Sequence, residues 1–252
     1  MTRHAENTRP EAPQAAPPSG VRMAADERRL QIAQVAMRLF SERGFRGTTT
    51  KEIAQAAGVS EAIIFRHFAT KEDLYTAIID YKGCAGLGAS PVAQAAVVEQ
   101  VCHSVAEAIE RGDDRAVFEG VALSMLEHHQ SDPDFLRLLM YLALENHSLA
   151  QVFWDKNVRV LYEFLGGYIR RRQAEGAFRE VNPYAAVRVF VGAIIHHSLV
   201  NLLWDKDPAR RILDVPNEEA ARQFADVFLR GVEAPGPEVP PRNNEGGADV
   251  KN

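Results

Sequence analysis

Arg66 and His67 follow a short apolar run, Ile63–Phe65, in the stretch GVSEAIIFRHF. Arginine can donate two hydrogen bonds to the major-groove edge of guanine, and cationic or hydroxyl side chains bind phosphate oxygens. A second group with phosphate-binding chemistry, Thr49–Lys51, precedes this stretch. Double-stranded DNA is therefore a candidate partner, provided that the fold places these side chains on one surface.

Short helices are predicted to position both groups. Thr49 and Glu52 have the spacing of a capping box, so a helix begins near residue 49, and its free N–H groups favour phosphate. Gly58 fits the tight turn that ends this helix, and Ser60 is a favoured N-cap for the next one. A longer helix with one apolar stripe is predicted over 26–43. This order is typical of a helix-turn-helix, whose second helix enters the major groove.

The whole pattern predicts an all-α fold. Apolar residues recur at helical spacing between two Pro-rich tails, 1–25 and 233–252, which are expected to be disordered. A three-helix helix-turn-helix DNA-binding domain is predicted over 26–86, with its motif at about 49–68, and a helical-bundle domain over 87–232. Helices are expected after the motif at 71–81, 91–111, 114–130, 133–145, 149–175, 183–205 and 217–231.

Charge and composition fit a cytoplasmic protein. The 252 residues carry a net charge of −5, whereas 26–86 contains nine basic and eight acidic side chains. A module of this kind can bind DNA only if its few cations share a face. No signal peptide and no apolar run long enough for a bilayer are expected. Two cysteines, Cys84 and Cys102, suit a reducing compartment, with a thiol sensor as the alternative.

The run Gly44–Ile79, GFRGTTTKEIAQAAGVSEAIIFRHFATKEDLYTAII, resembles the DNA-binding domain of TetR-type (TetR/AcrR-like) regulators. The match extends over about Asp26–Gly86, and beyond it only the helical layout and the length agree. The resemblance implies a sequence-specific transcriptional regulator, most often a ligand-responsive homodimeric repressor of a palindromic operator. The residues implied to contact DNA are Thr49, Thr50, Lys51, Ser60, Glu61, Ala62, Ile63, Phe65, Arg66, His67 and Lys71.

Within this set the resemblance implies distinct roles. Thr49–Lys51 would touch the DNA backbone, and His67 and Lys71 would clamp phosphates. Glu61–Ile63 and Arg66 would face base edges. The chemistry agrees, since glutamate can accept from cytosine, apolar groups meet the thymine methyl, and arginine reads guanine.

Phe65 departs from the family pattern. TetR-type proteins usually have tyrosine at this position, and its hydroxyl typically meets a phosphate. Phe65 lacks that hydroxyl but can pack on sugar or on a thymine methyl. For Ile63 and Phe65 ordinary core packing is the alternative to groove contact.

The C-terminal helices suggest a partner. The segment 183–205 is apolar nearly all round in its middle and needs cover on both sides, while 217–231 is amphipathic. The resemblance implies that these two helices form a four-helix homodimer interface, and a monomer with a central helix is the alternative.

Aromatic residues and methionines are dense between Val117 and Tyr168. At helical spacing most of them belong in a core, but an apolar bundle is also where small ligands bind. No cofactor is expected, but a small apolar or aromatic effector is. The pocket residues predicted for it are Phe118, Met125, Tyr141, Phe153, Trp154 and Tyr162.

Enzymatic function is not expected, because the chain has no nucleophile elbow, HExxH motif or phosphate loop. The histidine pairs His128-His129 and His196-His197 suggest a metal, but adjacent side chains diverge by about 100° on a helix and cannot easily share one ion.

Two other functions stay open. One is a non-inducible DNA-binding regulator, and the other is a ligand-binding helical bundle without DNA function.

Overall fold

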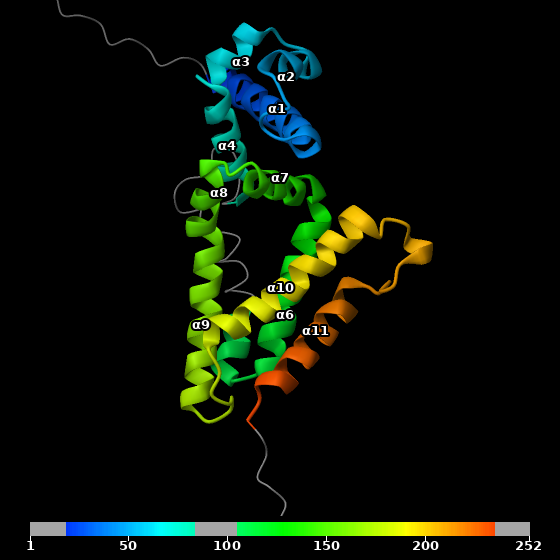
Figure 1. The fold of residues 1–252 in the computed structure, drawn as a ribbon. Coiled ribbons are helices and arrows are strands. Elements are labelled where there is room, and N and C mark those ends of the chain that lie inside the picture. Colours follow the sequence, from blue (N-terminus) through cyan, green and yellow to red (C-terminus); the bar gives the residue numbers. More distant parts are fainter. Residues whose placement is uncertain (1–18, 84–104, 235–252) are drawn as a thin grey trace, which may run out of the picture. The chain divides into compact units, whose positions relative to one another are not determined.

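The structure is a computed structural model that describes residues 19–83 and 105–234. The chain forms two compact units, Met1–Ile78 and Ile79–Asn252. The division lies within helix α4 (Lys71–Gly83), before the domain boundary expected at residue 86. The described residues are helical apart from turns, loops and an isolated bridge between Phe178 and Glu233 (Figure 1), which confirms the all-α prediction.

The N-terminal unit contains α1 (Ser19–Arg43), α2 (Thr50–Ala57), α3 (Glu61–His67) and most of α4. Its core is made by fully buried apolar side chains from all four helices, namely Ile32, Phe40, Ile53, Ile64, Phe68, Leu74 and Tyr75. Helix α1 begins inside the segment that was predicted to be a tail, because residues 19–25 include alanine, methionine and arginine, which favour helix. The expected start at residue 26 was therefore too late.

The turn between α2 and α3 follows from two local signals. Thr49 and Glu52 form the predicted capping box at the start of α2. Gly58 ends α2 with φ +67°, a left-handed conformation that side chains disfavour, and Val59 N donates to the Ala54 carbonyl at 3.0 Å. Ser60 has the extended backbone of an N-cap, but its side chain makes no capping hydrogen bond to α3.

The C-terminal unit is a helical bundle. Residues 105–111 are helical, and the rest of the helix expected at 91–111 lies outside the described residues. The elements that follow are α6 (Asp114–Ser131), α7 (Pro133–Leu144), α8 (Ser148–Phe153), the π-helical η2 (Trp154–Val158), α9 (Arg159–Ala174), α10 (Pro183–Leu199), the π-helical η3 (Val200–Trp204), the short 3-10 turn η4 (Pro208–Arg210) and α11 (Asn217–Val232).

Two predicted helices of this unit are not uniform. The segment expected as one α-helix at 149–175 contains the π turn η2, and the segment at 183–205 ends in η3. Hydrophobic spacing in the sequence did not indicate either turn. The expected tail also begins too early, because Ala234 N donates to the Ala177 carbonyl at 3.0 Å after α11 ends.

The core of the C-terminal unit lies where α6, α10 and α11 meet (Figure 1). Its centre is Phe118, whose ring contacts Phe190 and Phe228 at centroid distances of 5.0 and 4.6 Å. Helix α9 packs on α10.

One helical segment, Pro183–Trp204, is long and apolar enough to cross a bilayer by length and composition. The expectation that no such run exists was therefore wrong. However, Val187, Phe190 and Ile194 bury one face of this segment in the core.

Candidate functional site

Helix α3 presents an outward face of mixed chemistry. Glu61, Ala62 and Arg66 are exposed, and Phe65 is 47% exposed, whereas Ile64 is buried. Ile63 is half-buried, so it belongs to the edge of this face rather than to the core. Arg66 stands beside Phe65 without an ion-pair partner among the described residues, and its guanidinium is thus available to a base or phosphate.

The start of α2 lies next to this face. Thr49 Oγ1 accepts from the Glu52 N–H at 3.2 Å, and the Thr49 N–H donates to the Glu52 carboxylate at 2.8 Å. The Thr49 N–H and the Thr49 hydroxyl, 2.8 Å from the same carboxylate, hold the pKa of Glu52 below its usual value, so the box carries a carboxylate at neutral pH. The Thr50 hydroxyl donates to the Glu61 carboxylate and ties α2 to α3. Glu61 and Thr50 were both predicted to contact DNA, and they are also hydrogen-bonded to each other.

Lys71 is placed differently from the prediction. Its ammonium donates to the Phe45 carbonyl at 2.8 Å and to the Thr48 carbonyl at 2.9 Å, and it lies 4.0 Å from the centre of the Phe45 ring. Two of its three N–H donors thus hold the chain segment before α2. At most one donor remains for the phosphate that the resemblance implied.

His67 is half-buried at the end of α3. Its Nε2 is covered and has no hydrogen-bond partner among the described residues. Burial lowers the pKa of His67, and the charges of Arg66, Arg29 and Arg28 add to this effect. A neutral His67 is a weaker phosphate clamp than the predicted cation.

Arg29 on α1 was missed by sequence reasoning. Its guanidinium donates to the His67 carbonyl and lies 4.1 Å from the centre of the Phe68 ring, so it supports the end of α3. The residues in contact are 38 positions apart, and no local motif signals such a pairing.

In the C-terminal unit, an apolar cavity of about 330 Å³ lies among α6, α7, α8, η2 and α10. We name it the apolar cavity. Three of the six predicted pocket residues, Met125, Phe153 and Trp154, line it. His128 and His129 also line it, although the sequence analysis considered this pair only as metal ligands and not as part of a ligand pocket.

The other three predicted pocket residues lie elsewhere. Phe118 is fully buried among the rings of Tyr168, Phe178, Phe190 and Phe228, so its assignment to a pocket was wrong. Tyr141 and Tyr162 are not among the lining residues of the apolar cavity. Tyr162 instead packs behind Trp154, with ring centroids 5.7 Å apart.

A second cavity of about 480 Å³, here called the polar cavity, lies between the end of α6, η3 and the start of α11. Its polar lining includes His197, Asn201, Arg211 and Asp214. His129 lines both cavities, and its Nδ1 is 2.9 Å from Ser198 Oγ. Burial lowers the pKa of His129 to about 4, with the charge of His128 as a second cause.

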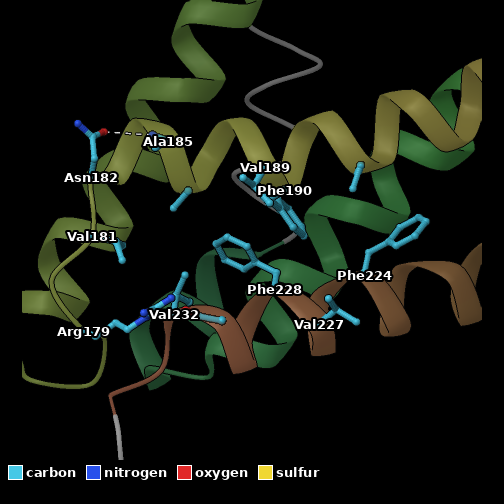
Figure 2. A pocket seen from close by; sticks show the side chains of 13 residues that line it. Arg179, Val181, Asn182, Ala185, Val189, Phe190, Phe224, Val227, Phe228 and Val232 are labelled. Carbon is cyan, nitrogen blue, oxygen red and sulfur yellow. Dashed lines mark hydrogen bonds between the residues drawn. The ribbon is translucent and has the colours of Figure 1, made fainter.

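The third hollow is an open apolar groove of about 570 Å³ between α10 and α11 (Figure 2). Phe190 and Phe228 lie next to each other in it, with ring centroids 5.0 Å apart. Val189 and Val227, one from each helix, are 69% and 73% exposed. Soluble monomers seldom leave such a continuous apolar face in water.

Cys84 and Cys102 lie outside the described residues. Among the residues that are described, no three His, Cys, Asp or Glu side chains gather as a metal site would require.

Comparison with known proteins identifies the N-terminal unit. Residues 32–78 match the family of "Bacterial regulatory proteins, tetR family". The chain is 24% identical over 210 residues to the HTH-type transcriptional regulator YvkB of Bacillus subtilis, covering 81% of this chain and 96% of that protein. It is 26% identical over 193 residues to the HTH-type transcriptional repressor AcnR of Corynebacterium diphtheriae, covering 76% and 90%.

The fold is also similar to solved structures. The ketosteroid transcriptional regulator KstR2 of Mycobacterium tuberculosis superposes with a TM-score of 0.55 at 17% identity, covering 82% of this chain and 96% of that one. The tetR match falls on the helices that form the helix-turn-helix, and the regulators above align over nearly their whole length. The N-terminal unit is accordingly a tetR-type DNA-binding domain, and the chain is a DNA-binding transcriptional regulator.

Proposed function

We propose that this regulator is a homodimeric, ligand-responsive repressor that reads a palindromic operator in the cytoplasm. TetR-family regulators bind operator DNA and act as dimers. The relative AcnR is named as a repressor, which supports the same direction of regulation here. The observation that carries the proposal is the exposed apolar groove of α10 and α11, because it supplies a surface that a second copy would cover.

A second copy fits this groove for a geometric reason. A two-fold axis beside α10 and α11 would bring the same apolar patch from both subunits together, so Val189 and Val227 would be buried in each. The four helices then form a bundle with an apolar interior. Dimerisation would also pair two α3 helices for two operator half-sites, spaced about 34 Å or a small multiple apart.

Operator contact is assigned to the outward face of α3. Arg66 would read a base, with Glu61 and Ala62 beside it, and Phe65 would pack on sugar or a methyl group. Thr49–Lys51 would position the DNA backbone at the start of α2. The apolar cavity would take a small effector, which shifts the equilibrium between two conformations by its difference in affinity for them.

The experiment uses Val227→Glu, which would place two like charges in the interface. Sedimentation should show a monomer with unchanged helix content, and binding to genomic fragments selected by pull-down should weaken at least about tenfold. Ile212→Glu is the matched control, because Ile212 is fully exposed but does not line the groove. A Val227→Glu protein that stays dimeric would place the interface elsewhere. Failure of the unmodified chain to retain any fragment at low salt would favour a bundle without DNA function.

A further inference from the structure

We propose that the apolar cavity binds an uncharged, largely aromatic molecule that donates a hydrogen bond from a hydroxyl or N–H group to Nε2 of His129. The inference rests on the proposed effector function and specifies its ligand class. It follows from the position of His129 between two cavities, from the tautomer that its neighbours impose, and from the charge of the lining.

The position of the ring decides which atom the ligand meets. His129 lines both cavities, while Ser198 lines only the polar one. Nδ1 is 2.9 Å from Ser198 Oγ, so the Nδ1 edge of the imidazole is turned to the polar cavity. The two ring nitrogens point away from each other, and because His129 also lines the apolar cavity, we assign Nε2 to that side. The described residues supply no hydrogen bond to Nε2.

The tautomer follows from the hydroxyl of Ser198. A serine hydroxyl has one hydrogen to donate, and that of Ser198 goes to the Ile194 carbonyl at 3.1 Å. We infer that Ser198 Oγ accepts from His129, which places the imidazole proton on Nδ1. Because burial lowers the pKa of His129 to about 4, the ring is neutral at pH 7. Nε2 then carries a lone pair and can only accept, so the ligand must be the donor.

The lining of the apolar cavity disfavours charged ligands. It contains no lysine or arginine among the described residues to neutralise an anion. Its carboxylate, Asp132, accepts the Phe135 N–H at 3.1 Å and caps the N-terminus of α7, where the helix dipole balances its charge. An anion would thus lose its hydration beside a carboxylate. The rest of the lining offers Met125, Phe153 and Trp154 to an aromatic body.

Both π-helical turns of the described residues border these cavities. Trp154, Asn157 and Val158 of η2 line the apolar cavity, and Asn201 and Leu202 of η3 line the polar one. Single π turns within α-helices occur often at functional sites. Their placement is an independent reason to locate the ligand here.

The test uses three biphenyls that differ at one end, namely 4-phenylphenol, 4-methoxybiphenyl and biphenyl-4-carboxylate. Calorimetry gives their dissociation constants for the full chain with Trp204→Phe, which leaves Trp154 as the only tryptophan. 4-Phenylphenol should bind about 5-fold more tightly than the methoxy compound, which cannot donate, and at least about 10-fold more tightly than the carboxylate. It should also quench Trp154 fluorescence.

His129→Phe keeps an aromatic ring but removes the acceptor, and should abolish the preference for 4-phenylphenol over 4-methoxybiphenyl. His129→Gln keeps an acceptor and should retain part of it. Equal or tighter binding of the methoxy compound or the carboxylate, no binding of any probe, or an unchanged preference in His129→Phe would overturn the proposal. Binding of ligand-free protein to genomic fragments, measured by anisotropy on the same preparations, tests the proposed function separately.

Discussion

We predict different effects for substitutions of two lysines in the N-terminal unit, although the family resemblance implied that both contact DNA phosphates. Lys51 is exposed at the start of α2, and no hydrogen bond within the described residues engages its ammonium. Lys71 is half-buried and bonded to the Phe45 and Thr48 carbonyls. Replacing each with methionine keeps most of the aliphatic side chain and removes the ammonium, with its charge and its hydrogen-bond donors. Lys71→Met should therefore lower the stability of the protein, whereas Lys51→Met should lower its affinity for DNA.

The expected size follows from the contacts of Lys71. Each hydrogen bond from a charged donor contributes about 1.5–3 kcal/mol, and a cation over an aromatic ring about 0.5–1 kcal/mol. Water reaches this half-buried site and can replace part of both bonds. We therefore expect Lys71→Met to lower the free energy of unfolding by about 2–3 kcal/mol. Lys51→Met, which breaks no internal bond, should change it by less than about 0.5 kcal/mol.

The assay combines urea denaturation followed by circular dichroism with DNA titrations at several salt concentrations. Lys51→Met should weaken operator binding and lower the slope of log affinity against log salt by about 1, as for the loss of one phosphate contact. Lys71→Met, measured where it remains folded, should leave that slope unchanged. If Lys71→Met is as stable as the unmodified protein and lowers the salt slope, the structural role of Lys71 is refuted.

Three further predictions follow from single residues. Phe65→Tyr should tighten operator binding about 3- to 10-fold by adding one hydrogen bond to phosphate, and unchanged affinity would place Phe65 away from the DNA backbone. Gly58→Ala should destabilise the chain by about 1 kcal/mol or more in denaturation, because its φ of +67° strains a side chain. His129 has a folded pKa of about 4 against 6.5 when unfolded, so the unfolded state binds more protons between these values. Stability should thus fall by about 3 kcal/mol from pH 6.5 to 4, and a His129→Phe protein with the same pH profile would contradict this.

The N-terminal unit could be predicted closely because its signals are local. The capping box of Thr49 and Glu52 and the turn at Gly58 depend on residues within a few positions of each other. The roles of Lys71 and Arg29 depend instead on partners 23 to 38 residues away. Only tertiary packing decides whether such a cation faces solvent or a carbonyl. Residue type alone therefore could not distinguish the structural role of Lys71 from the exposed position of Lys51.

The lining of the apolar cavity was predicted only in part for a related reason. Aromatic density indicated the helices around this cavity, and Phe153 and Trp154 line it. Phe118 has the same apolar character, but α6 turns it toward Phe190 and Phe228, where no space remains. Hydrophobicity predicts that a side chain avoids water. It does not distinguish a filled core from a cavity, because that depends on how well the surrounding side chains pack.

The π turns show why the polar part of the site could not be predicted. A π turn inserts one residue into a helix, so side chains after it are rotated by about 100° from where an α-helical count places them. Around η2, Trp154, Asn157, Val158 and Leu161 line the apolar cavity. At η3 the π turn accompanies the hydrogen-bonded distance of 3.1 Å between Asn201 Nδ2 and His197 Nε2 in the polar cavity. A uniform helical period cannot represent an inserted residue, so hydrophobic spacing indicates neither turn. Within the described residues, both breaks in the helical period thus lie at the two cavities that share His129.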